Sequence, residues 1–309
     1  MERKKLVFLR RTKKTTIMKI SSITLALCFC CILYCNGLTS CSSDNDTSTV
    51  PHINSSDSMA LVSIYKQIGP WSKEWDLKNI TTWNGVQTAL DVDRNEIRVI
   101  GFEVYNGSFK GKLPKEFCQL TELKRLVISG GSMEGTIPEE LGDLKKLYYL
   151  CIANNNVHGP IPESIGKLTD LSELQLMNNK ISGTIPNSFG KLTNLETLYI
   201  TGTKITGEIP KGLSNMNKLA VVALSNNEFS GSFPIEILRN NLFIMCENNN
   251  ITDLPFEVWD DNSDLIPPML KNNRLSGIIP EWIKQTKKWQ EYKSICIGKQ
   301  QDHYGYSNY

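Results

Sequence analysis

The stretch Leu171–Asn194 reads LSELQLMNNKISGTIPNSFGKLTN and contains the pattern that decides the fold. Its first nine residues follow LxxLxLxxN, in which Leu174 and Leu176 alternate with outward-pointing residues. Successive side chains of an extended chain point to opposite faces, so this alternation predicts a short strand with buried leucines. Gly183 and Pro186 predict a tight turn and the end of strand pairing, because glycine tolerates positive φ and proline lacks an N–H.

The same pattern recurs every 24 residues. Prolines stand at Pro114, Pro138, Pro162, Pro186, Pro210 and Pro234, glycines at Gly111, Gly135, Gly159, Gly183, Gly207 and Gly231, and leucines at Leu123, Leu147, Leu171, Leu195 and Leu219. A fixed period of this length indicates a solenoid, in which one repeat cannot close a core and stability comes from stacking.

These residues make the chain similar to leucine-rich repeat proteins, in the 24-residue GxIP subtype best known from plant receptors and also found in bacterial surface proteins. The resemblance covers about eight units at 97–280. It implies an α/β-type solenoid with a curved parallel sheet on its concave face, turns and irregular or 3-10 coil on its convex face, and helical caps. Two units depart from the pattern: 241–264 has Asp253-Leu254-Pro255 in place of GxIP, and 265–288 has Pro267-Pro268 where its strand should lie.

An asparagine nine residues into the unit is expected to turn inward. There its amide can satisfy backbone groups of neighbouring turns that would otherwise be buried without a partner. The position holds Asn155, Asn179, Asn227, Asn249 and Asn273, but Gly107, Gly131 and Thr203 in three other units. The predicted ladder is therefore incomplete.

The repeats need a cap at each end. At 57–96, Asp57 is placed to N-cap a helix whose apolar residues share one face, and Gly69-Pro70 would end that helix. Three tryptophans follow and precede Asn84-Gly85-Val86, which resembles the family's N-terminal cap without the cysteine pair of the plant version; the tryptophans are Trp71, Trp75 and Trp83. At 281–309, the stretch EWIKQTKKWQEYKSIC predicts a closing helix, followed by a polar and aromatic tail.

Residues 1–40 predict an export signal. Basic residues up to Lys19 precede the mostly apolar run ISSITLALCFCCILYCNGL, which is short for a membrane span, and Met18 is an alternative start. The run ends in Leu38-Thr39-Ser40-Cys41, which resembles the bacterial lipobox and implies cleavage before Cys41 and lipidation of this residue. Lipid chains would then hold the protein on a membrane. The alternative is a soluble secreted protein.

The polar residues 41–56 are expected to form a flexible tether. Ser42 follows the cysteine, so the usual inner-membrane retention signal is missing, and the early acids Asp44 and Asp46 look like the surface-export signal of lipoproteins in some Gram-negative anaerobes. We therefore expect an outer membrane lipoprotein that is exposed on the surface, with a periplasmic orientation as the alternative.

Charge and cysteine content exclude several classes of function. The 34 bases and 32 acids of the chain fall to 26 and 31 without residues 1–40, which hold eight bases and one acid, so the body carries a net charge of −5. An acidic body argues against a nucleic-acid partner.

The cysteines that follow residue 41 are expected to be free thiols, because they fall at different phases of the repeat; they are Cys118, Cys151, Cys246 and Cys296. Scattered histidines and the lack of a phosphate loop or metal spacing predict no cofactor, metal or catalytic site.

The outward strand positions supply the candidate binding residues. Tyr149, Met177 and Tyr199 are expected to form an apolar anchor patch, because aromatic and sulfur side chains are typical of contact sites. Polar contacts are expected beside the patch from Arg125, Glu173 and Gln175. The alternative is that strands simply favour such residues.

The predicted function is a non-catalytic surface recognition or adhesion module that binds a protein, peptide or glycan through its concave face. A passive spacer would have a polar concave face instead. A secreted eukaryotic receptor fragment is a further alternative; the N-x-S/T sequences at Asn79, Asn106 and Asn250 favour it, whereas the lipobox opposes it.

Overall fold

The computed structural model describes residues 51–69, 83–240, 242–301 and 304–307. The predicted signal at 1–40, the predicted lipid site Cys41 and two of the predicted cap tryptophans, Trp71 and Trp75, lie outside these ranges. None of the helices in the described ranges has the length and apolar character needed to cross a membrane.

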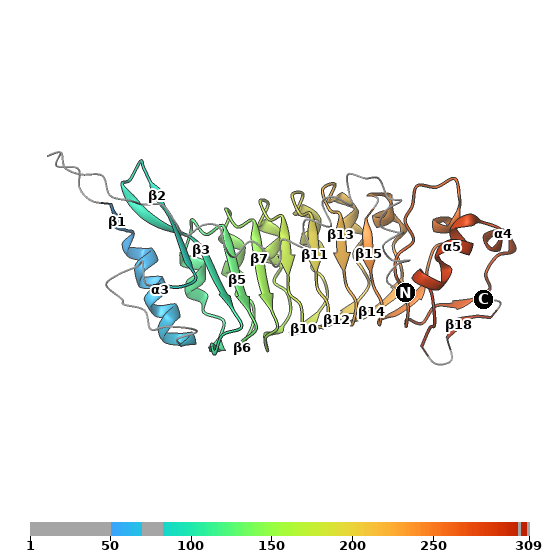
Figure 1. Ribbon diagram of the computed structural model, residues 1–309, viewed down its shortest axis with the longest axis horizontal. Coiled ribbons are helices and arrows are strands. Elements are labelled where there is room, and N and C mark those ends of the chain that lie inside the picture. Colours follow the sequence, from blue (N-terminus) through green and yellow to red (C-terminus); the bar gives the residue numbers. More distant parts are fainter. Residues whose placement is uncertain (1–50, 70–82, 241, 302–303, 308–309) are drawn as a thin grey trace. The chain divides into compact units, whose positions relative to one another are not determined.

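The main sheet has nine strands, of which eight follow one another in chain order from the N-terminal cap to the C-terminal repeats (Figure 1). Its strands are β1 (His52–Ile53), β2 (Val86–Asp91), β3 (Glu96–Tyr105), β5 (Arg125–Ser129), β7 (Tyr149–Ala153), β9 (Glu173–Gln175), β11 (Thr197–Tyr199), β13 (Val221–Ala223) and β15 (Phe243–Met245). All pairs are parallel except β2 with β3. Equivalent positions face each other, so the predicted register is confirmed from β3 to β15. The unit with Pro267-Pro268 contributes only a bridge from Met269 to Met245.

A second set of short parallel strands lies after the asparagine turn, where the sequence predicted only turns and coil. Its strands are β8 (His158–Gly159), β10 (Lys180–Gly183), β12 (Lys204–Gly207), β14 (Glu228–Ser232) and β16 (Asn250–Asp253), with β4 (Lys110–Lys112) and β6 (Ser132–Glu134) forming a separate pair. In β10, buried Ile181 follows exposed Lys180, and Gly183 has a φ of 83° at the strand's end. This alternation is the signal that the sequence offered for these strands.

The convex side carries 3-10 helices that start directly after a proline. In the described ranges these helices are η2 (Lys115–Gln119), η3 (Glu139–Asp143), η4 (Glu163–Lys167), η5 (Asn187–Lys191), η6 (Lys211–Asn215), η7 (Ile235–Asn240) and η8 (Phe256–Trp259). Proline fixes φ and lacks the N–H that a first helical turn leaves unpaired, so it suits this position. The units between 97 and 264 thus turn from strand to 3-10 helix, as the resemblance implied.

The inward asparagine ladder is confirmed. Asn179 donates through Nδ2 to the carbonyl oxygens of Ile152 (2.8 Å) and Leu176 (3.2 Å), and its Oδ1 accepts from the backbone N–H of Val157 (3.2 Å). Gly131 holds the ladder position in a unit that has no asparagine there, and the Phe109 ring packs against it. A Cβ on residue 131 would lie 2.1 Å from Phe109 Cε2. The aromatic ring therefore occupies the space that the asparagine fills in other units.

The N-terminal helix α3 (Ser55–Ile68) begins earlier than the sequence suggested, and the predicted N-cap is wrong. Asn54 is the cap, since its Oδ1 accepts from the backbone N–H of Ser56 (3.0 Å) and Asp57 (3.2 Å). Sheet pairing already starts at His52, inside the segment 41–56 that was expected to be a tether.

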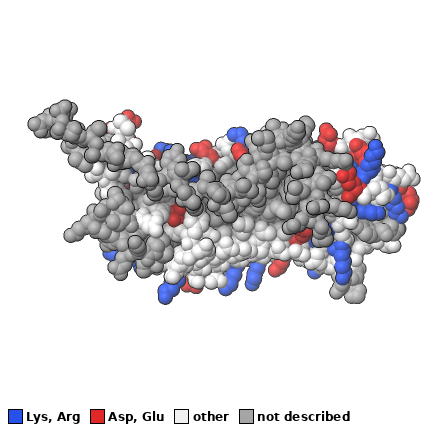
Figure 2. Space-filling view, viewed as in Figure 1, with Lys and Arg blue, Asp and Glu red and all other residues white. Residues whose placement is uncertain are grey.

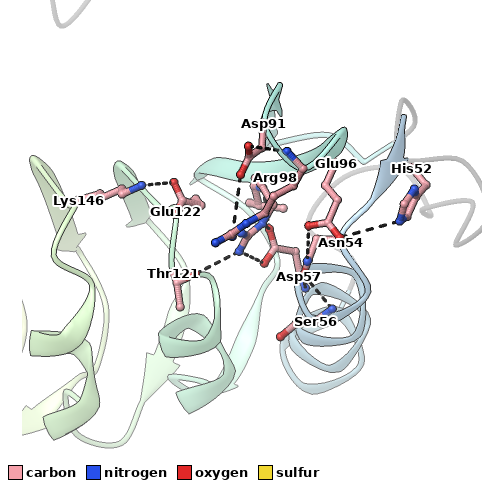
Figure 3. Close-up of polar contacts among 12 residues, drawn as sticks. His52, Asn54, Ser56, Asp57, Asp91, Glu96, Arg98, Thr121, Glu122 and Lys146 are labelled. Carbon is pink, nitrogen blue, oxygen red and sulfur yellow. Dashed lines mark hydrogen bonds and ion pairs between the residues drawn. The ribbon is translucent and has the colours of Figure 1, made fainter. Parts of the chain in front are cut away.

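Asp57 has a different role, shown in Figure 3: it pairs with Arg98 of β3. Its carboxylate accepts from Arg98 Nε (3.0 Å), Arg98 Nη2 (3.1 Å) and the backbone N–H of Val99 (2.9 Å), and the side chain is fully buried. Arg98 Nη2 also donates to Thr121 Oγ1 at 3.1 Å. The buried pair fixes the cap helix to the first long strand. Trp83 is buried in the same core, as predicted for a cap residue.

The C-terminal cap consists of two helices, α4 (Glu281–Lys284) and α5 (Lys287–Cys296), rather than the single helix expected. Thr286 separates them and caps α5 by accepting from the backbone N–H of Trp289 (3.2 Å). The Trp289 ring packs edge-on against Trp259 of the last 3-10 helix, with centroids 5.0 Å apart.

The tail forms a further, degenerate turn of the solenoid. Gln300 takes the place of the ladder asparagine, because Nε2 donates to the carbonyl oxygen of Leu270 (3.2 Å) and Oε1 accepts from the backbone N–H of Leu275 (3.2 Å). Strand β18 (Gly305–Tyr306) then pairs in parallel with β17 (Ser276–Gly277). The repeat pattern therefore extends beyond 280 in weakened form.

Candidate functional site

The six predicted binding residues lie together on the concave face, meaning the outward side of β3 to β15. Arg125, Tyr149 and Glu173 face one another across β5, β7 and β9, and the pairing continues to Thr197 on β11. Gln175 and Tyr199 face each other one row further along the strands. The structure thus brings the residues together, while their role in binding stays a prediction.

Part of the concave face is a small apolar cluster, separate from the main core. Val127, Cys151 and Ala153 are buried, and Tyr149 and Met177 pack against them. A sheet face that is only solvated has no need of such a cluster. Tyr199 is not in this cluster, because it lies across from the polar Gln175 on the neighbouring strand. Of the three residues predicted to form the apolar patch, only Tyr149 and Met177 therefore pack together on the cluster.

Arg125 is held by an acidic and an aromatic partner. Its Nε donates to Glu103 Oε1 at 2.7 Å, and its guanidinium lies 4.1 Å from the centroid of the Tyr149 ring. Glu103 also accepts from Gln87 Nε2 (3.0 Å) and from the Tyr105 hydroxyl (3.0 Å). Glu103 was not selected from the sequence as a site residue, although the register placed it outward. The sequence could have indicated the pairing, because the register places Glu103 diagonally across from Arg125 on the neighbouring strand.

A second polar group lies on the other side of Tyr149. Gln175 donates through Nε2 to Glu173 Oε1 (2.5 Å) and to the Tyr149 hydroxyl oxygen (3.2 Å). Burial raises the pKa of Glu173 and of Tyr149, and in Glu173 it outweighs the hydrogen bond from Gln175. The concave face thus offers carboxylate, amide, guanidinium and phenol groups in neighbouring positions, which suits recognition of polar and aromatic groups.

The cysteine of this face is a poor nucleophile. Burial is the main reason why the pKa of Cys151 is raised to about 12, and its Sγ contacts Gln175 Oε1 at 3.5 Å. Within the described ranges, no group of three or more histidine, cysteine, aspartate or glutamate side chains is arranged to hold a metal ion.

Charged side chains are mixed along the edge of the repeats. Figure 2 shows Lys and Arg side chains spaced along the edge where β10, β12 and β14 lie, with acidic side chains among them. One pair of the convex side joins Lys167 Nζ to Asp143 Oδ1 at 3.4 Å, and both side chains are more than half exposed. Mixed signs of charge indicate a solvated edge rather than a phosphate-binding surface.

Parallel strands in constant register, an inward asparagine ladder and proline-started 3-10 helices define the class of repeat solenoids that present an extended face. The particular family follows from comparison: residues 96–294 match the model described as leucine-rich repeat region, so the chain belongs to the leucine-rich repeat family. No curated protein matches the chain significantly.

Solved structures share the fold. The complex PEPR1-AtPEP1 is similar over 78% of this chain with a TM-score of 0.58 at 21% identity, and the match covers 41% of that chain, so this protein spans less than half of it. A plant ice-binding protein is similar over 74% of this chain and 82% of its own, with a TM-score of 0.63 and 25% identity. The ectodomain of the receptor kinase SOBIR1 from Arabidopsis thaliana is similar over 57% of this chain and 95% of its own, with a TM-score of 0.51 and 28% identity.

Proposed function

We propose that this chain is a non-catalytic recognition module that binds a protein or peptide through the concave face around Tyr149 and Gln175. The observation that carries the proposal is the composition of that face. Val127, Cys151 and Ala153 form a buried cluster on the outward side, and Tyr149 packs on it, where a passive spacer would have solvated polar side chains.

The polar groups support the same function. Arg125 and Gln175 are held by intramolecular hydrogen bonds on either side of Tyr149, so their positions are fixed before a partner arrives. Fixed side chains lose less conformational entropy on binding, which favours affinity. Among proteins with this fold, PEPR1 has been solved with AtPEP1, and SOBIR1 is a receptor kinase ectodomain.

We also propose that the module is displayed on the outer membrane as a lipoprotein anchored at Cys41. The support is the sequence Leu38-Thr39-Ser40-Cys41 and the polar segment that follows it. A short polar tether would allow the concave face to meet partners beyond the membrane surface.

Binding to variants of the full chain tests the proposed site. Peptides are selected on the wild-type chain from a displayed random library, and their affinity is compared for Tyr149→Ala and Tyr199→Ala. We expect about ten-fold or greater loss for Tyr149→Ala, since aromatic anchors dominate binding energy, and a smaller loss for Tyr199→Ala, which lies outside the apolar cluster.

The matched control is Lys167→Glu on the convex side, where the wild-type lysine is exposed. This variant should bind the selected peptides normally. Normal binding by both tyrosine variants together with loss in Lys167→Glu would place the site on the convex side and refute the proposal.

A further inference from the structure

The two carboxylates near the centre of the concave face differ in how well they are paired. Glu103 accepts hydrogen bonds from Arg125 (2.7 Å), from Gln87 (3.0 Å) and from the Tyr105 hydroxyl (3.0 Å), so both of its oxygens have donors. Among the described residues, the Glu173 carboxylate accepts only from Gln175, and only through Oε1. Glu173 therefore has an oxygen, Oε2, without a donor in the described part of the chain.

The Glu173 carboxylate is less hydrated than a fully exposed one. The side chain is partly buried, and burial raises its pKa. A charged group that is withdrawn from water is stabilised by an opposite charge with hydrogen-bond donors. Arg125 is already bound to Glu103 and lies two strands away, a backbone distance of about 10 Å at the usual strand spacing.

A second unpaired acceptor lies beside Glu173. Thr197 faces Glu173 directly across the pairing of β9 with β11, and its side chain is 3% exposed. Its Oγ1 is buried and has no hydrogen-bond partner in the described part of the chain. A buried hydroxyl without a partner costs free energy, which a bound donor would recover.

Aromatic faces complete the surroundings. Tyr149 faces Glu173 from β7, and Tyr199 lies on β11 close enough for the Glu173 charge to contribute to its raised pKa, although burial contributes more. Tyrosine rings attract cations through their faces. This chain already shows the arrangement once, since the Arg125 guanidinium bonds to Glu103 and lies over the Tyr149 ring at 4.1 Å.

The chain itself supplies no cation on this part of the face. The outward positions of β9, β11, β13 and β15, together with the residue two places after each strand, hold no lysine or arginine; these residues are Glu173, Gln175, Met177, Thr197, Tyr199, Thr201, Val221, Ala223, Ser225, Phe243, Met245 and Glu247. Arg125 is bonded to Glu103 and acts on the Glu173 charge only from two strands away, so a cation bonded directly to Glu173 must come from a binding partner.

We infer that Glu173, Thr197 and Tyr199 form a recognition site on the concave face for one cationic side chain, arginine or lysine, of the bound protein or peptide. The inference rests on the proposed concave-face function and names the chemistry of its partner. Glu173 Oε2 accepts one N–H of the cation, and the Tyr199 ring lies against its flat or apolar part. Thr197 Oγ1, which has almost no exposed surface in the free chain, accepts a second N–H after the side chains around it move aside. Apolar groups of the partner then contact the apolar outward positions of β13 and β15, which include Val221 and Ala223.

Peptides selected on the wild-type full chain from a displayed random library serve as the probe. We expect them to share a lysine or arginine at one position. Replacing that residue by citrulline or acetyl-lysine should lower affinity about ten-fold or more, and Glu173→Gln should cause a similar loss. The two losses should not add when combined, because each removes the same contact. The variant Glu173→Lys should instead prefer the peptide in which the basic residue is replaced by glutamate.

The matched control is Glu247→Gln, which makes the same substitution at another outward position of the concave face and should leave affinity unchanged. Peptides that lose affinity with Tyr149→Ala but bind Glu173→Gln normally would refute the cation site and leave the concave-face function standing. The cation site is also refuted if the selected peptides share no basic position. If no selected peptide depends on Tyr149, the proposed function and the cation site fail together.

Discussion

The variant Asp57→Ala should destabilise the N-terminal cap far more than the loss of a helix cap would. The Asp57 carboxylate accepts from Arg98 Nε (3.0 Å), from Arg98 Nη2 (3.1 Å) and from the Val99 N–H (2.9 Å). Arg98 is 7% exposed, and the variant would leave its guanidinium with a single described acceptor, the Thr121 hydroxyl. Removing one partner of a buried ion pair typically costs about 3–5 kcal/mol.

Two other variants, each with a smaller expected loss in the free energy of unfolding, serve as references for this value. Asn54→Ala removes the true N-cap and should cost about 1 kcal/mol. Asp143→Ala breaks the exposed pair with Lys167 and should cost between about 0 and 1 kcal/mol. The double variant Asp57→Leu with Arg98→Met should be more stable than Asp57→Ala, because it removes both buried charges.

Urea unfolding followed by circular dichroism measures the total change for each variant. Hydrogen exchange of the α3 amides shows whether the cap opens before the repeats, as the nearest-neighbour contacts of a solenoid allow. A cost of about 1 kcal/mol for Asp57→Ala, equal to that of Asn54→Ala, would contradict the conclusion that the buried pair holds the cap helix on the sheet.

Four further outcomes are expected. Leu174→Ala, whose side chain is fully buried, should lower the free energy of unfolding by about 2–5 kcal/mol in chemical denaturation, whereas Tyr149→Ala should lower it by about 1 kcal/mol; equal losses would contradict the assigned faces. Thiol titration of the processed protein in denaturant without reductant should find close to four thiols, and few should react in the native state at neutral pH, because burial raises the pKa of Cys118, Cys151 and Cys296 to about 12; two or fewer in denaturant would indicate disulfides. Cys41→Ala should move the protein from the membrane to the soluble fraction, and retention after a salt wash would refute the lipid anchor. Burial raises the pKa of Glu173 above its usual value of 4.5, so the folded chain keeps this proton to higher pH than the unfolded chain does. The contribution of Glu173 to the free energy of unfolding therefore falls as the pH rises from the unfolded pKa through the folded pKa. The melting temperature of Glu173→Gln at neutral pH should equal or exceed that of the wild type, and a marked decrease would contradict a raised pKa for Glu173.

The repeat could be predicted because its determinants are local and periodic. Leu174, Asn179, Gly183 and Pro186 each fix one step of the turn, and the fixed spacing carries the same geometry to the next unit. The outward positions followed from the alternation of the strand, so the placement of Tyr149 beside Glu173 needed no tertiary information.

Contacts between distant segments could not be predicted in the same way. Asp57 is a residue type that often caps helices, but its carboxylate pairs in the core with Arg98, which lies 41 residues later in the chain. Asn54 caps the helix instead. The tail was missed as a repeat because a glutamine fills the asparagine position and α5 replaces the strand. The pairing of Arg125 with Glu103 rather than Glu173 likewise depends on side-chain direction, which the register alone does not give.

Hydrogen–deuterium exchange of the full chain with a selected peptide bound tests the central claim most directly. Bound peptide should protect the amides of the concave strands, above all β5, β7, β9 and β11, because it covers the face formed by residues from Arg125 to Tyr199. The 3-10 helices of the convex side, such as η4 and η5, should exchange as they do in the free protein. Protection confined to those helices, with unchanged exchange in the four strands, would contradict recognition through the concave face.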